Sequence, residues 1–178
     1  MKEITRLLPV MLITLVSGCF VEPQFVPEFP IGDVEGYKPI YASSDQTTIV
    51  FNAPRDLHNP GKIYIISHFL LINEKYEGIH VFDNSNPSSP IALGFLAIAG
   101  NTEMAVRNNV LYADHLSDLV ALDVADWNNI EEVSRFKREF SSQHIPPGTG
   151  RYFECIVESK GVVVGWELAM LNNPKCFR

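Results

Sequence analysis

The stretch that decides the fold is Gly78-Ile79-His80-Val81-Phe82-Asp83-Asn84-Ser85-Asn86-Pro87, an apolar run that ends in an aspartate and a polar turn. A second run of the same form, Asp118-Leu119-Val120-Ala121-Leu122-Asp123, follows 40 positions later. An aspartate at the end of a strand accepts hydrogen bonds from backbone amides two residues on and opens a turn. The two runs therefore predict two equivalent strand–turn units, and they explain both aspartates without any chemistry.

The similarity continues on both sides of these strands. Arg55 to Ile65 aligns with Glu103 to Ala113 at an offset of 48 residues, so the first unit is expected to hold an insertion of eight residues. Its apolar part, Phe69 to Glu77, is interpreted as a protruding hairpin suited to docking a partner. A third, half-length copy begins at Glu154 and continues into Val162-Val163-Val164.

Short β-branched and aromatic runs separated by turn residues predict an all-β fold. Four short strands that recur every 40 to 48 residues are typical of a β-propeller blade, a sheet that buries its faces only by stacking on its neighbours. We expect stacked four-stranded antiparallel sheets in a partial, propeller-like body of about 2.5 blades. The strands expected in the second unit are Glu103–Arg107, Val110–Asp114, Leu119–Val124 and Glu131–Phe136.

At these residues the chain resembles the LVIVD-repeat proteins of bacteria, through Gly78 to Pro90 and again through Leu119 to Asp126. The second copy departs from the family pattern at Trp127-Asn128-Asn129, where the family has a proline-bearing turn. The resemblance covers residues 55–165. It implies a propeller-like body in an exported, cell-envelope lipoprotein of Bacteroidetes type, and it carries over no active-site residue because the family has no established catalytic set.

Propellers have four to eight blades, more than the repeats of this chain supply. Three arrangements stay open. The sheets form an open stack, a second copy of the chain completes a ring, or the segment Tyr37 to Ala42 adds an outer strand to the last half-blade. The open stack is the favoured expectation.

The start of the chain has the form of a bacterial lipoprotein signal. Lys2 and Arg6 precede an apolar run, Leu7 to Val16, that is too short to span a bilayer. The run ends in Val16-Ser17-Gly18-Cys19, which resembles a lipobox. Residues 1–18 are thus expected to be removed as a signal peptide, with Cys19 as the lipidated first residue; a plain signal peptide with an incidental cysteine is the alternative.

The resulting domain organisation follows from composition. Residues 19–36 are rich in proline and are expected to form an extended tether, and residues 37–178 the β-repeat domain. We expect the protein to be anchored through its lipid to a membrane of the bacterial cell envelope, with the outer membrane favoured. The body would then lie in the periplasm or at the cell surface.

The net charge argues against one class of binding partner, and the cysteine content predicts a disulfide. The chain holds 21 acidic and 14 basic residues, for a net charge of −7, and an acidic chain is a poor nucleic-acid binder. No nucleic-acid partner is therefore expected. Cys155 and Cys176 remain after processing, and an even pair in an exported protein usually forms a disulfide. Closing a loop of about 22 residues would contribute about 3 kcal/mol.

Three residues are candidates for ligand binding. Asp114 and His115 stand with Asp118 in the densest acid–histidine cluster, at the turn between two expected strands. Trp166 is the third candidate, because an indole ring can stack on a sugar. The alternatives are a solvated turn for the cluster and core packing for Trp166. No two histidines have metal-ligand spacing, so neither a metal nor another cofactor is expected.

The sequence carries no nucleophile elbow, phosphate-binding glycine loop or zinc-protease motif. The expected function is therefore that of a lipid-anchored envelope protein with a binding or scaffold body and no catalytic activity. Its expected partners are another envelope protein, a glycan, or a second copy of the chain that completes the stack. The alternative is an envelope hydrolase or glycan-processing accessory protein with a shallow site on the blade loops, formed by Asp114, His115 and Glu154.

Overall fold

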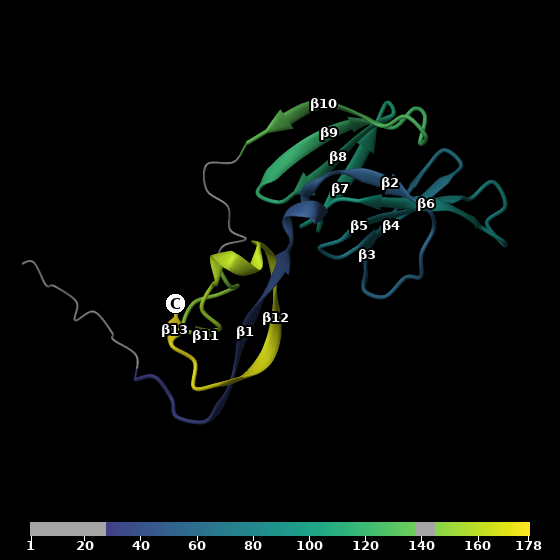
Figure 1. Cartoon of the computed structure of the whole chain (residues 1–178). Helices are drawn as coiled ribbons and strands as arrows, with labels where there is room; N and C mark the ends of the chain where they lie inside the picture. Colours follow the sequence, from purple (N-terminus) through teal and green to yellow (C-terminus); the bar gives the residue numbers. More distant parts are fainter. Residues whose placement is uncertain (1–27, 138–144) are drawn as a thin grey trace, which may run out of the picture.

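The structure is a computed structural model that describes residues 28–137 and 145–178. The expected signal peptide and the expected lipid site at Cys19 lie outside the described residues. Within the described part of the chain the fold is all-β with three sheets, which confirms the predicted class of a partial, propeller-like body (Figure 1). The elements are β1 (Asp33–Ala42), η1 (Ser44–Thr47), β2 (Val50–Asn52), β3 (Pro60–Ile66), β4 (Phe69–Glu74), β5 (Gly78–Asp83), β6 (Ile91–Ala97), β7 (Met104–Arg107), β8 (Val110–His115), β9 (Asp118–Asp123), β10 (Glu131–Phe136), β11 (Tyr152–Phe153), η3 (Glu158–Lys160), β12 (Val162–Asn172) and β13 (Cys176–Phe177).

Two antiparallel meanders form the repeated units. Strands β3 to β6 pair in chain order in what we call the first sheet, which β2 extends beside β6. Strands β7 to β10 pair in chain order in the second sheet. The four strands expected for the second unit are all present, each within two residues of its expected bounds.

The expected insertion over Phe69 to Glu77 is wrong. This segment contains β4, an inner strand paired on both sides with β3 and β5, and Leu71 at its centre is fully buried. Neighbouring strands of a meander have similar composition, so the alignment placed β3 on β8. The registers pair Ile63 with Ile72 and Met104 with Ala113, which makes β3 the equivalent of β7.

With this correction the two meanders match position by position. The offset is 41 residues for β3 and β4 and 40 residues for β5 and β6. The turns match as well, since Asp83 accepts the Ser85 amide at 2.8 Å and Asp123 accepts the Ala125 amide at 2.9 Å. The change from Pro87 in the first unit to Trp127 in the second therefore leaves this turn intact, because the aspartate rather than a proline defines it.

The first and second sheets pack on each other around the main core. We call the face of the first sheet that lies in this core, with Leu71 and Val81, its front. The face of the second sheet that lies in the same core carries Leu111 and Val120. The residues of the first sheet that are equivalent to these two lie on its opposite face, which we call its back. The two units thus stack front to back, as consecutive propeller blades do. The buried residues of this core are Leu71, Ile79, Val81, Leu96, Ile98, Met104, Val106, Leu111, Ala113, Val120, Leu122, Val124 and Trp127.

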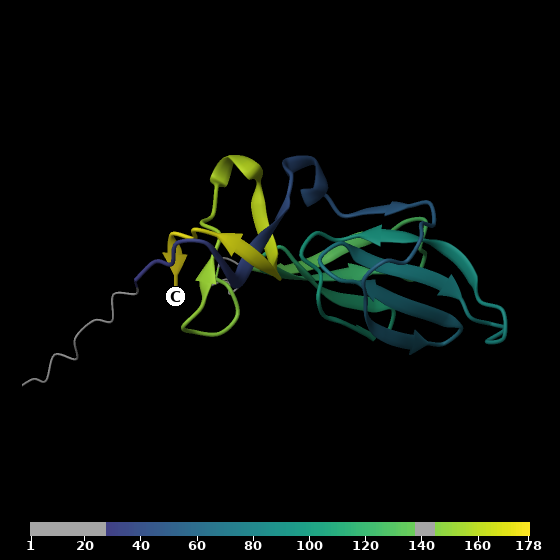
Figure 2. The same cartoon turned by 90° about the horizontal axis from the view of Figure 1, so that it is seen from below.

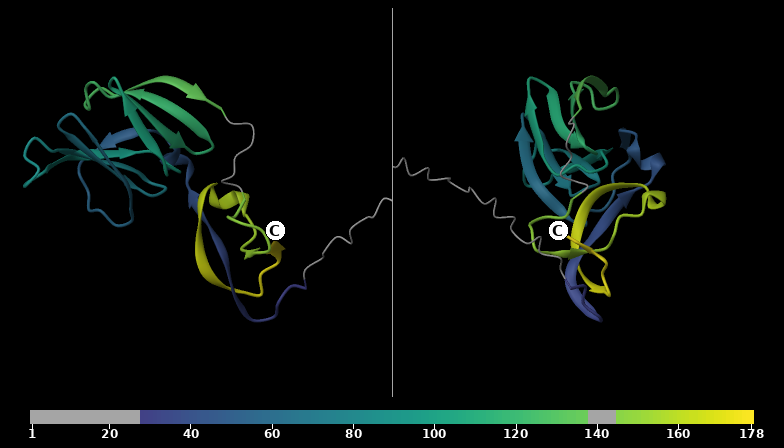
Figure 3. Two further views of the ribbon diagram at one scale, coloured as in Figure 1. Left: turned by 180° about the vertical axis from the view of Figure 1, so that it is seen from behind. Right: turned by 90° about the vertical axis from the view of Figure 1, so that its left-hand side faces the viewer.

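The third sheet, which we call the terminal sheet, is built from both ends of the described chain. Strand β1 pairs antiparallel with β12 and parallel with β11, and β13 pairs with β11. Tyr37 to Ala42 does supply a strand to this sheet, but β1 lies between β12 and β11 rather than at the outer edge that the third arrangement expects, and it already begins at Asp33, inside the expected tether. Figures 2 and 3 show this sheet at one end of the stacked pair.

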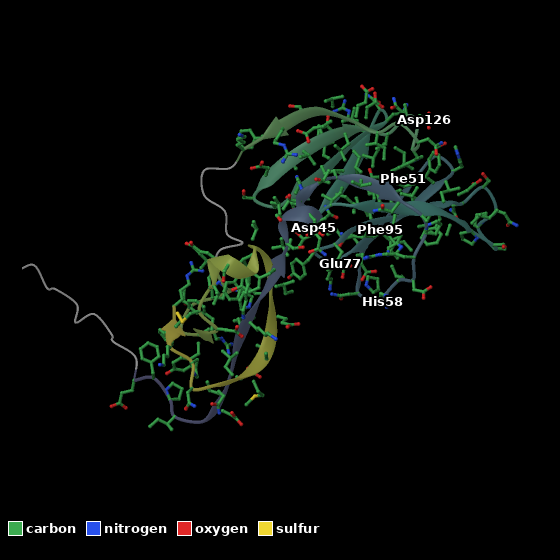
Figure 4. The ribbon with its side chains drawn as sticks, viewed as in Figure 1. Asp45, Phe51, His58, Glu77, Phe95 and Asp126 are labelled. Atoms are coloured by element: carbon green, nitrogen blue, oxygen red, sulfur yellow. A yellow bond between two sulfur atoms is a disulfide. The ribbon has the colours of Figure 1, made fainter. Side chains whose placement is uncertain are left out.

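The half-copy expected at Glu154 does not form a strand there. The Glu154 amide donates to the Tyr37 carbonyl at 2.8 Å, and residues 154–157 run as irregular chain. The predicted disulfide between Cys155 and Cys176 is present and ties this segment to β13 (Figure 4). The segment is therefore held by the disulfide and by the backbone hydrogen bond from Glu154 to Tyr37, rather than by pairing as a strand.

Candidate functional site

Two hollows flank the segment that links β1 to β2. The first, the junction cleft, has a volume of about 800 Å³ and lies between the terminal sheet and the first sheet. The second, the Trp127 hollow, has a volume of about 560 Å³ and lies between the first and second sheets. Both volumes fall in the range of small-molecule sites. The residues lining the Trp127 hollow include Thr47, Phe51, His115, Trp127, Asn128, Asn129, Glu132 and Arg135.

The junction cleft is bordered by charges that pair with each other. Asp45, Glu77 and Phe95, labelled in Figure 4, belong to its lining. The Arg55 guanidinium lies 3.7 Å from the centre of the Phe95 ring and forms an ion pair with Glu77. These contacts hold the loop between β2 and β3 against the back of the first sheet, so they have a structural explanation.

A buried acid–histidine pair lies under the same loop. Glu74 and His80 are almost wholly buried, with 3.0 Å between Oε2 of Glu74 and Nε2 of His80. Burial raises the pKa of Glu74, but the hydrogen bonds from the His58 and Asn59 amides and from His80 outweigh it, and the net pKa is lowered. The pair anchors the loop from within the sheet, since each group is satisfied by protein contacts.

Asp114 and His115, two of the predicted binding residues, are engaged on opposite faces of β8. The Asp114 carboxylate accepts a hydrogen bond of 3.0 Å from the Thr102 hydroxyl. The ring of His115 lies between two partners, the Thr47 carbonyl at 2.9 Å from Nε2 and the Arg135 guanidinium at 3.0 Å from Nδ1. A carbonyl only accepts and a guanidinium only donates, so His115 must be the neutral Nε2–H tautomer.

The electrostatics of the site agree with that tautomer. Burial lowers the pKa of His115, and the positive charge of Arg135 lowers it further. Arg135 in turn binds Glu132 through two hydrogen bonds of 2.8 and 2.6 Å, and Asp118 at 3.1 Å. The hydrogen bond from Arg135 holds the pKa of Glu132 below its usual range. The structure thus joins His115 and Asp118 in one fixed network at the edge of the Trp127 hollow.

Trp166, the third predicted binding residue, lies elsewhere. It is buried in the terminal sheet, where its ring meets that of Phe153 edge-on at 5.5 Å, and it lines neither of the two hollows. Core packing, the alternative named for it, accounts for its position. Glu154, the third residue of the hydrolase alternative, pairs with Lys160 at 3.2 Å. The contacts of these residues therefore do not favour the hydrolase.

Trp127 is the functional candidate that the sequence argument missed. Its ring packs between Phe51 and Phe69, with centroids 5.9 and 5.7 Å away, and it lines the hollow. Its buried indole Nε1 donates a hydrogen bond to no atom of the described residues. The signal was present in the sequence, because Trp127-Asn128-Asn129 is where the second unit departs from the first.

Comparisons with known proteins add no further identification. No family model matches the chain, and neither a curated protein nor a solved structure matches it. Across residues 28–137 and 145–178, no helix has the length and apolar character needed to cross a membrane. In the same residues, no three His, Cys, Asp or Glu side chains gather as a metal site would require.

Proposed function

We propose that this protein is a lipid-anchored component of the bacterial cell envelope that binds a neutral glycan in the Trp127 hollow and catalyses no reaction. The anchor and the location rest on the lipobox-like residues that end at Cys19. The outer membrane is the favoured site, with the body in the periplasm or at the cell surface. The binding role rests on the hollow.

The observation that carries the binding role is the buried indole N–H of Trp127, which has no acceptor among the described residues. A buried donor without an acceptor costs about 1–3 kcal/mol, so a ligand oxygen that meets this nitrogen when the ring turns towards the hollow would be favoured there. A hydroxyl or acetamido oxygen of a saccharide is such an acceptor. The side chains of Asn128 and Asn129 and the carboxylate of Glu132 line the same hollow and offer partners for further hydroxyls.

The charges of the site favour an uncharged ligand. Glu132 and Asp118 share the single positive charge of Arg135, and His115 is neutral. The local balance is therefore negative, and it repels acidic saccharides at short range. A neutral saccharide meets no such penalty.

Binding by the full-length protein in detergent tests the proposal. Calorimetric titration with chito-oligosaccharides, which are neutral and acetamido-bearing, should give saturable binding, whereas oligogalacturonates of equal length should bind more weakly. Trp127→Phe keeps an aromatic ring and removes the N–H, so it should weaken binding about 3- to 10-fold. Trp166→Phe is the matched control, because both tryptophans are 7% exposed and only Trp127 lines the hollow. Equal affinities for the two variants, or no binding of either sugar, would contradict the proposal.

The anchor is tested separately at Cys19. Cells that express the chain and are fed a labelled fatty acid should yield labelled protein, and Cys19→Ala should abolish the label. Label retained on the Cys19→Ala protein would show that this cysteine is not the lipid site.

A further inference from the structure

The part of the back of the first sheet that lies around β3 is apolar and exposed. Ile63 and Ile65 on β3 are 64% and 62% exposed, and they point to this face beside their cross-strand partners Ile72 and Leu70. Phe82 continues the patch on β5. The loop between β2 and β3 lies on another part of this face, where His58 and Asn59 bind Glu74 and Arg55 lies over Phe95. A sheet face of this composition in water normally packs on another surface.

The equivalent face of the second sheet shows what kind of surface packs on the back of a unit. The back-face residues Ile63, Ile65, Leu70, Ile72 and Phe82 are equivalent, in that order, to Met104, Val106, Leu111, Ala113 and Leu122. Every one of these second-sheet residues is buried in the main core against the front of the first sheet. The back of a unit is therefore built to receive the front of another unit.

The front of the second sheet is the complementary open surface. Tyr112, Leu119 and Phe136 lie there and are exposed. Their equivalents in the first sheet are Leu71, Ile79 and Leu96, all fully buried in the main core. In the described chain, the front of the second sheet and the back of the first sheet are therefore both uncovered. Inside the chain, a front and a back of these kinds pack on each other.

We propose that a second copy of this chain docks here, with the front of its second sheet on the back of the first sheet. The charges agree with this pairing. Lys62 and Glu103 form an ion pair between the two sheets, and they occupy equivalent positions of the repeat. Stacking a second copy therefore brings Glu103 of one copy towards Lys62 of the next. These two side chains have opposite charges, as they do in the ion pair within the chain.

The contact between copies is weaker than the one within the chain. Inside the chain the Tyr64 hydroxyl donates to the Val106 carbonyl at 3.2 Å. The position equivalent to Tyr64 in the second sheet is Ala105, which has neither the ring nor the hydroxyl. Association is thus reversible, and because two different faces meet, it proceeds head to tail into a ring or an open series rather than into a two-fold dimer.

Cysteine cross-linking of the full-length protein tests both the surface and its direction. Ile65 and Ala105 are equivalent to Val106 and Tyr64, which meet inside the chain, so Ile65→Cys and Ala105→Cys place thiols on opposite sides of the proposed contact. With a flexible bis-maleimide cross-linker, which bridges the length of the missing tyrosine side chain, a mixture of the two single variants should give cross-linked dimers that contain one of each. Dimers of Ile65→Cys with itself, cross-linking to a different protein, or a level no higher than in the parent chain would overturn the proposal.

A second measurement uses charge instead of thiols. Sedimentation of the full-length protein in detergent should show association that Ile65→Glu weakens at least 10-fold. Met170→Glu is the matched control, because Met170 is 67% exposed on the terminal sheet, away from the patch. A wild-type protein that stays monomeric over the whole concentration range, or equal effects of both variants, would rule the contact out. Neither readout involves a sugar, so its failure is distinct from a failure of glycan binding.

Discussion

The front-to-back stacking of the two sheets makes a sharp prediction about stability. Met104 and Ile63 occupy equivalent positions of the repeat, but Met104 is 8% exposed and Ile63 is 64% exposed. Replacing each by alanine removes a similar apolar side chain from the same place in the unit. Only the first replacement leaves a cavity between two sheets.

The magnitudes follow from burial. Truncating a buried methionine to alanine costs about 2–5 kcal/mol, through lost transfer free energy and the cavity left behind. The side chain of Ile63 is mostly in water, so Ile63→Ala should cost about 1 kcal/mol or less. For a chain of this size the difference corresponds to a melting temperature lower by roughly 10 °C for Met104→Ala than for Ile63→Ala.

Urea unfolding, followed by tryptophan fluorescence, measures both values. The experiment is done on dilute protein, where the proposed association leaves Ile63 uncovered, and then repeated at high concentration. We expect a gap of at least about 1–2 kcal/mol between the variants when dilute. Equal losses in dilute solution would refute the reasoning, because they would mean that the two faces of the stack are equally covered within one chain.

Three further predictions concern other parts of the fold. Cys176→Ser should lower the free energy of unfolding by about 3 kcal/mol, measured by urea titration against the oxidised parent, because the bridge to Cys155 closes a segment with a sequence separation of 21. The pKa of Glu74 is lower in the folded state, so its contribution to stability is full above its unfolded pKa of about 4.3 and is lost as pH falls through the folded value. Urea midpoints from pH 7 to pH 3 should show this loss, and Glu74→Gln should flatten that part of the curve. Gly78→Ala should cost more than about 1 kcal/mol in the same assay, because φ is +149° and a Cβ there would collide with the Leu96 carbonyl.

The sequence was sufficient for the fold class and for most strands, because alternating apolar runs and their aspartate turns are local signals. It failed where two strands look alike. Ile63-Tyr64-Ile65 on β3 resembles Leu111-Tyr112-Ala113 on β8, and composition alone does not separate an inner from an edge strand of a meander. Burial separates them, since Ile63 and Ile65 are exposed and Leu111 is fully buried.

The site was only partly predictable for a related reason. The sequence points to His115 because acid and histidine stand together in the chain, and the structure adds Arg135 from β10, two strands further along. In the sequence Trp166 is a candidate through its chemistry alone, and its neighbour Phe153 is brought to it only by the pairing of β11 and β12 with β1. Such long-range pairings leave no local mark in the sequence.

The Trp127 hollow lies where the repeat is broken. Trp127 takes the position that Pro87 holds in the first unit, while the aspartate turn around it keeps the same hydrogen bonds. The ring reaches Phe51 on β2, a strand that the first sheet has in addition to its meander. The turn itself does not require a tryptophan, since the first unit forms the same turn with Pro87, and the ring of Trp127 adds instead to the core between the two sheets. Positions that break a local pattern which the rest of the fold keeps tend to coincide with functional sites, and Trp127 is such a position.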